Sequence, residues 1–201
     1  MYGFRLLVIG LTCVALQCCR QETRSAEEKA AAPERKWAEK IERPGLANLH
    51  KVSDSLYRGA QPTAEGFREL RKLGVKTVIN LRSRHSDKDL LGDTGLGYVA
   101  IETKAYDVGD EAVVKFLEVV SDKSRAPFFV HCEYGSDRTG TMCAIYRIVV
   151  CGWSKDEAIE EMTEGGFGFH PLWKNLISYI RKADIGKLRK QAGLDRVESE
   201  D

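Results

Sequence analysis

The sequence predicts an α/β fold in which a central, mostly parallel sheet is flanked by helices. Short apolar runs that are typical of buried strands alternate along the chain with stretches whose apolar residues recur at helical spacing. This alternation is typical of strand–helix–strand units that share one parallel sheet. In such a sheet, reactive loops gather at the carboxyl ends of the strands, so we expect the functional residues there.

The composition is that of one ordinary folded domain. The chain has 201 residues, of which 43% are hydrophobic, and its 31 Lys and Arg are balanced by 30 Asp and Glu. This balance gives no reason to expect nucleic acid as a partner. The chain contains 6 cysteines, and Cys13, Cys18 and Cys19 fall within the first twenty residues. The remaining cysteines do not form a disulfide framework and have no metal-ligand spacing, so we expect no metal and no cofactor.

The two ends of the chain differ from its middle. Residues 1–20 have the pattern of a signal peptide or lipoprotein signal, because an apolar stretch too short to span a bilayer follows Arg5. Cys18 and Cys19 lie where a bacterial lipoprotein carries its lipid, so we expect export, either to the periplasm or as an anchored lipoprotein. Any membrane anchoring would then be through the N-terminus alone. Residues 21–43 indicate a flexible charged tether, 44–185 the folded domain and 186–201 a charged tail.

Within the folded domain the pattern predicts the following elements. Strands are expected at 52–58, with a short strand at 49–51 before it as an alternative, and at 75–81, 98–101 and 127–130. Helices are expected at 64–73, 110–120, 138–150, 155–162 and 172–180. Thr63 and Ser154 are the expected N-caps of two of these helices, the latter in a capping box. The polar segment 82–97 is expected to be a solvated loop, or alternatively a basic rim that attracts anionic substrates.

A ten-residue segment from His131 to Gly140 carries the chemistry. A buried strand delivers Cys132 to a tight loop, and a helix begins where the loop ends. Glycines allow backbone amides in such a loop to converge, and the helix N-terminus adds its positive dipole. With Cys132 and Arg138 bracketing it, the loop suits an anion held by amides and a guanidinium, with a thiolate beneath.

The string His131-Cys132-x-x-Gly135-x-x-Arg138-Thr139-Gly140 resembles the signature of the cysteine-dependent protein tyrosine phosphatase superfamily. The compact bacterial dual-specificity branch is the most similar, and the segment 56–62 is similar to the opening strand and turn of its members. The resemblance implies a phosphatase domain of the dual-specificity type and a phosphocysteine formed on Cys132. It also implies that Thr139 hydrogen-bonds the cysteine sulfur and that His131 orders the loop. The implied substrate-binding groups are those of Glu133, Tyr134, Gly135, Ser136, Asp137 and Arg138.

The resemblance further implies a general acid, which the family takes from an aspartate on a separate loop. Asp107 is one candidate, because it lies in the middle of the loop that precedes a helix. Asp110 is the second, although it could instead cap that helix, and Glu102 is a more distant third. The sequence lacks the Trp-Pro-Asp form of the larger phosphatases, so both aspartates remain candidates.

The expected activity is phosphomonoester hydrolysis by a monomer, on phosphotyrosine and also on phosphoserine or phosphothreonine. A phosphorylated protein or a small phosphomonoester would be the substrate. The alternatives are a phosphoinositide or inositol phosphate phosphatase and a non-catalytic phosphate-binding module. Glu133 and Asp137 stand in the loop where family members that act on inositol phosphates tend to have lysines, so we expect highly anionic substrates to be disfavoured. Phe167 and Phe169 are expected in the core.

Overall fold

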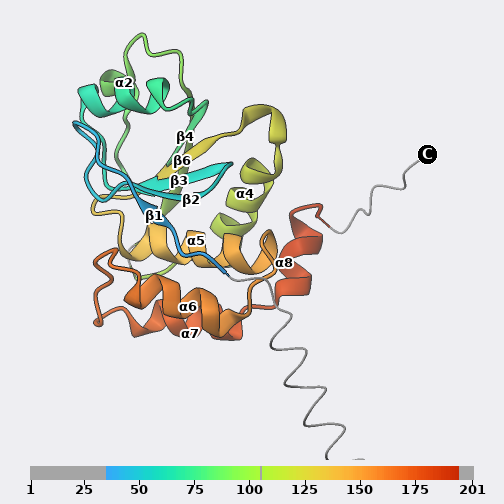
Figure 1. The fold of residues 1–201 in the computed structure, drawn as a ribbon. Coiled ribbons are helices and arrows are strands. Elements are labelled where there is room, and N and C mark those ends of the chain that lie inside the picture. Colours follow the sequence, from blue (N-terminus) through green and yellow to red (C-terminus); the bar gives the residue numbers. More distant parts are fainter. Residues whose placement is uncertain (1–34, 105, 195–201) are drawn as a thin grey trace, which may run out of the picture. The chain divides into compact units, whose positions relative to one another are not determined.

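A six-stranded sheet organises the computed structural model, which describes residues 35–104 and 106–194 (Figure 1). Its strands are β1 (Glu39–Lys40), β2 (His50–Ser53), β3 (Leu56–Gly59), β4 (Thr77–Arg82), β5 (Gly97–Thr103) and β6 (Phe128–His131). They lie in the order β1-β2-β3-β6-β4-β5. The neighbouring strands β3, β6, β4 and β5 are parallel to one another, whereas β1 and β2 extend the sheet in antiparallel fashion. The predicted α/β fold with a mostly parallel sheet is thus confirmed.

Helices cover both faces of the sheet. They are α2 (Ala64–Lys72), α3 (Lys88–Leu91), α4 (Asp110–Ser121), the 3-10 helix η1 (Lys123–Arg125), α5 (Asp137–Val149), α6 (Lys155–Glu164), α7 (Lys174–Lys182) and α8 (Ile185–Gln191). In Figure 1, α2 lies on one face, while α4 and α5 lie on the other with α6 and α7 beyond α5. None of the helices in the described part of the chain is long and apolar enough to cross a membrane.

The central strands are buried on both faces, which explains their continuous apolar runs. Ile79 and Val130 project into the larger core beneath α4 and α5. Their neighbours Val78 and Phe129 project into the smaller core beneath α2. Because β6 lies between β3 and β4, its carboxyl end opens at the centre of the sheet, where the loop of Cys132 begins.

The structure changes several predicted boundaries. The strand predicted at 52–58 is wrong as a single element, because the chain reverses at Asp54 and Ser55 and forms the β2–β3 hairpin. Strand β1 lies inside the predicted tether, and α8 continues past the boundary placed at 185. The predicted signal at 1–20 lies outside the described residues. The helices after Thr63 and Ser154 begin at the predicted caps, and the Ser154–Glu157 capping box is present.

A buried ion pair joins α5 to α6. Glu161 accepts hydrogen bonds from Arg147 Nε at 2.8 Å and Nη2 at 2.6 Å, and both side chains are almost fully buried. The same carboxylate accepts from the amide of Ala38 at 2.7 Å, and the Arg147 guanidinium lies over the ring of Trp153. The pair therefore ties the helical layer to the segment that leads into β1.

We expect Glu161→Gln to lower the free energy of unfolding by about 3 kcal/mol, because it leaves the buried Arg147 charge without its carboxylate. The control is Glu160→Gln on the exposed side of the same helix, which should change stability by less than about 0.5 kcal/mol. Urea denaturation of both variants measures the difference. Equal stability of the two variants would contradict this prediction.

Candidate active site

The loop between β6 and α5 forms the centre of the site. Strand β6 ends at His131 and α5 begins at Asp137, so Cys132 lies directly above the middle of the sheet. The Cys132 residue is only 3% exposed. Helix α5 points its N-terminus at this loop, which places a positive dipole end beside the sulfur.

Each main-chain carbonyl from Cys132 to Ser136 accepts a hydrogen bond, and three of the five donors come from another segment of the chain. Cys132 O accepts from His131 Nδ1 at 3.1 Å, Glu133 O from the Gln61 amide at 3.1 Å and Tyr134 O from Asn48 Nδ2 at 3.0 Å. Gly135 O accepts from Arg58 Nη2 at 2.7 Å, and Ser136 O from the Gly140 amide at 2.8 Å.

This arrangement fixes the direction of the loop amides. In a planar trans peptide the C=O and the following N–H point in opposite directions, so carbonyls held outward turn the next amides inward. The amides of residues 133–137 donate to no other main-chain oxygen among the described residues. These amides are therefore available to an anion above Cys132, and we refer to them as the cradle.

Arg58 supports this cradle from beneath. Its side chain leaves β3, is only 1% exposed and also lies 3.4 Å from Ser136 O. Burial lowers the pKa of the Arg58 guanidinium, and the ring of Phe167, 3.9 Å from Arg58 Cζ, covers its charge. An arginine in an otherwise apolar strand is the sequence signal that could have identified this residue.

Gly135 is required by the close approach of the loop to β3. Its φ is +72°, and a Cβ at this position would collide with the main chain of Gly59 and Ala60. This close packing explains why the signature string has a glycine at this position.

Arg138 connects the cysteine loop to the neighbouring strand ends. Its Nη1 donates to Leu81 O in β4 and to Thr103 O in β5, each at 3.4 Å. Because β5 leads into the loop of the two candidate acids, this guanidinium links that loop to the anion cradle.

The structure separates the two candidate acids. Asp110 accepts from Tyr179 at 3.0 Å and Lys187 at 2.9 Å, so it anchors α4 to α7 and α8. The hydrogen bond from Lys187 holds the pKa of Asp110 below its usual range, which makes it a poor proton donor. Asp107 is exposed, and it lines a cavity of about 580 Å³ between β5 and α4 together with Lys104 and other residues.

Three loop side chains have roles that differ from the expectation. The buried hydroxyl of Thr139 makes no hydrogen bond to Cys132 Sγ or to any other described residue, so the predicted thiolate contact is absent. The Asp137 carboxylate accepts from the amide and from Nδ1 of His170, at 2.9 and 2.8 Å. The Ser136 hydroxyl donates to Phe167 O at 2.9 Å. Asp137 and Ser136 therefore offer an anion only their amides, because their side chains hold the loop before α7.

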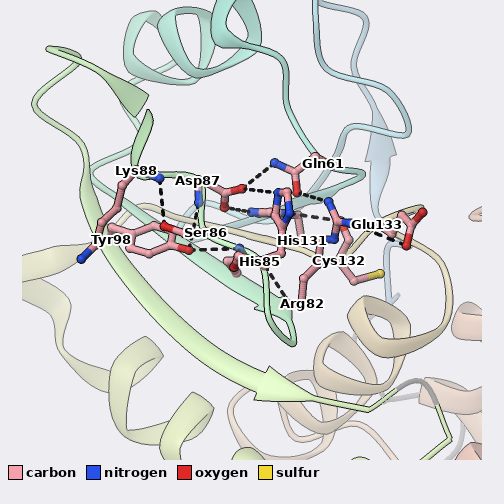
Figure 2. Close-up of polar contacts among 11 residues, drawn as sticks. Gln61, Arg82, His85, Ser86, Asp87, Lys88, Tyr98, His131, Cys132 and Glu133 are labelled. Carbon is pink, nitrogen blue, oxygen red and sulfur yellow. Dashed lines mark hydrogen bonds and ion pairs between the residues drawn. The ribbon is translucent and has the colours of Figure 1, made fainter. Parts of the chain in front are cut away.

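A buried cluster behind Cys132 was not predicted (Figure 2). Asp87 lies in the segment expected to be a solvated loop, yet its side chain is fully buried. One carboxylate oxygen lies 2.9 Å from His131 Nε2 and the other accepts from Gln61 Nε2. Gln61 in turn accepts from Arg82 Nη1 at 3.1 Å. Nothing in the local pattern around Asp87 distinguishes it from its exposed neighbours, because its burial depends on contacts with distant segments.

A loop of available amides over a buried cysteine, at the end of the central strand of this fold and followed by Arg138 in the first turn of α5, is the arrangement of a cysteine-dependent phosphatase. A family model described as "DSP-PTPase phosphatase fused to NAD+ Kinase" matches residues 41–175. The chain is also 38% identical to the dual specificity protein phosphatase TpbA of Pseudomonas aeruginosa over 165 residues, or 82% of this chain and 74% of that protein. The chain belongs to this family of dual-specificity phosphatases.

A solved structure of TpbA and one further relative show the range of the family. The crystal structure of a cysteine-to-serine variant of P. aeruginosa TpbA in complex with pTyr has a TM-score of 0.70 and 34% identity. The match covers 81% of this chain and 98% of that one. An inositol diphosphatase of Arabidopsis thaliana, DSP3, is 26% identical over 152 residues, which are 72% of this chain and 73% of that protein.

We expect Gly135→Ala to lower kcat/KM by about 100-fold or more, because the added Cβ must push the cradle away from β3. The matched control is Gly152→Ala, which has a similar φ of +70° but open space around the added Cβ. Both variants carry the backbone strain of a left-handed residue, and only the first moves the cradle. Steady-state kinetics with an aryl phosphate measure the difference. Full activity of Gly135→Ala would show that the close approach is not needed.

Proposed function

We propose that this phosphatase hydrolyses phosphotyrosine in proteins, and also phosphoserine or phosphothreonine, through Cys132, Arg138 and Asp107. The observation that carries the proposal is the set of hydrogen bonds to the carbonyls of residues 132–136. Because these carbonyls are bound by donors around the loop, the loop amides are left to bind an anion above the cysteine. The pTyr complex of the TpbA relative supports an aryl phosphate as the substrate.

In the proposed first step, Cys132 Sγ attacks phosphorus and the bond from phosphorus to the leaving oxygen breaks. The amides of residues 133–137 and the Arg138 guanidinium hold the three other phosphoryl oxygens while their charge redistributes. Asp107 gives its proton to the leaving phenolate or alkoxide. In the second step Asp107 takes a proton from water, the water oxygen attacks the phosphocysteine, and the thiolate leaves.

Asp107 is the preferred acid because of how the two aspartates are bound. Asp110 is held as a carboxylate by Lys187 and Tyr179, whereas Asp107 is exposed on the loop that follows β5. Arg138 contacts the end of β5, so a movement of that loop can bring Asp107 toward the phosphoryl group. A usable acid also argues against a non-catalytic phosphate-binding module.

A preference for phosphotyrosine over inositol phosphates rests mainly on Glu133. The Asp137 carboxylate already accepts hydrogen bonds from the amide and from Nδ1 of His170, so Glu133 is the acidic side chain of the loop without such partners on the substrate side. The Glu133 side chain is 47% exposed and lies 3.8 Å from Arg82, which screens it only in part. A substrate with several phosphate groups would therefore meet a negative charge beside the cradle.

We expect Asp107→Asn to lower kcat on a phosphotyrosine peptide by about 100-fold or more with little change in KM, because only the leaving step loses its proton. Asp110→Asn is the matched control and should stay within about threefold of the native kcat, since it removes a partly exposed ion pair.

Cys132→Ser should have no measurable turnover, and EDTA should leave the native enzyme unaffected. A larger loss in Asp110→Asn would reassign the acid, and turnover by Cys132→Ser would overturn the mechanism. A panel of phosphotyrosine peptide, phosphoserine peptide and inositol hexakisphosphate tests the substrate class. Preference for the inositol phosphate would contradict the role given to Glu133.

We also propose that the enzyme is exported and acts as a monomer, with residues 1–20 as its signal. The support is the apolar segment after Arg5 and the cysteines that follow it. The measurement is the mass of the mature chain recovered from its native cell envelope. A chain that retains Met1 and stays with the cytosolic fraction would contradict export.

A further inference from the structure

We propose that Asp87 is a positioning residue that keeps His131 doubly protonated, so that the imidazolium charge stabilises the Cys132 thiolate. This inference rests on the phosphatase mechanism proposed above. It assigns a function to a buried carboxylate that contacts neither the cradle nor the substrate side of the cysteine.

The geometry around His131 fits two N–H donors when Asp87 is ionised. Nδ1 lies 3.1 Å from the Cys132 carbonyl oxygen, which can only accept a hydrogen bond. Nε2 lies 2.9 Å from Asp87 Oδ2. A neutral imidazole has one N–H and can satisfy one of these acceptors, whereas an imidazolium satisfies both.

Asp87 is suited to hold this charge. Burial disfavours its ionised form, but the hydrogen bonds from His131 and Gln61 and the charge of His131 outweigh burial, so the pKa of Asp87 lies below its ordinary value. The Asp87 amide also donates to the hydroxyl of Tyr98 at 3.3 Å, which fixes the turn. An ionised carboxylate with no exposed surface needs a cation beside it, and His131 is the nearest one.

Figure 2 shows the series of polar contacts that leads from Glu133 through Arg82 and Gln61 to Asp87 and His131. Glu133 faces Arg82, Arg82 donates to Gln61, and Gln61 donates to Asp87. His85 Nε2 also lies 3.5 Å from Asp87. The series of contacts then continues through His131 to the peptide of Cys132. Each charge in this series stabilises the next, and the thiolate is its last member.

Other groups influence Cys132 from the elements around it. The cations are Arg58 on β3 and Arg138 on α5, and neither contacts Asp87 or His131 in the described structure. Cys143 on α5 is fully buried, and burial raises its pKa to about 11, so it stays neutral at physiological pH. Removing the Asp87 charge therefore tests the His131 contribution separately from the two arginines.

The test is Asp87→Asn, which preserves shape and removes the charge. We expect the acidic limb of the kcat/KM–pH profile to move to higher pH, so that activity at about pH 5 falls roughly tenfold while activity at about pH 8 stays near the native value. The rate at which iodoacetate alkylates Cys132 should show the same displacement. Asp89→Asn, on the exposed side of α3, is the matched control and should leave both profiles unchanged.

Alkylation needs no turnover, so failure of this proposal is distinguishable from failure of the proposed substrate or acid. An equal loss of activity at every pH, with an unchanged alkylation profile, would show a merely structural role and overturn the proposal. A second measurement does not depend on folding of the variant. Nitrogen-15 NMR of the 4 histidines in the native chain should show both His131 nitrogens protonated at about pH 7, and a single protonated nitrogen would overturn the inference.

Discussion

The hydrogen bonds to the outward-facing carbonyls of residues 132–136 are the constraint on which the site depends. Amides that all point at one position have aligned dipoles, and a short loop does not adopt that arrangement unless the opposite carbonyls are satisfied. Asn48, Arg58 and Gln61 supply the donors to three of them, and all come from the segment around the β2–β3 hairpin. The first strands therefore build the cradle, although they contribute no chemical group to the reaction.

This dependence explains why a guanidinium is buried in the sheet. Moving Arg58 out of water is costly, and the energy is recovered only if its hydrogen bonds are well formed and its charge is covered. Gly135 O and the ring of Phe167 meet these needs. Phe167 is held in turn, because its carbonyl accepts from Asn48 and Ser136. The result is a cradle formed before substrate arrives, which avoids reorganisation during the reaction.

The features of the site that can be predicted from the sequence are those determined by residues close together in the chain. The loop, its cysteine and the start of α5 follow from a continuous run of residues, and the parallel sheet follows from the alternation of apolar runs. Arg58 and Asp87 could not be assigned in the same way, because their roles depend on contacts with residues far along the chain. The Thr139 contact failed for a related reason. A signature names the residue, but the direction of its hydroxyl depends on how the first turn of α5 is packed.

In the proposed mechanism the nucleophile and the acid hold opposite protonation states at the same pH, and the two residues lie at different places in the sheet. Cys132 lies at the buried centre, near the N-terminus of α5, Arg58 and Arg138, all of which favour an anion. Asp107 follows β5, the edge strand, where the side chain is exposed to water. Arg138 lies in the first turn of α5, and its guanidinium donates to Thr103 O at the end of β5. In the proposed mechanism the residue that binds the phosphoryl group is therefore also hydrogen-bonded to the strand that leads to Asp107.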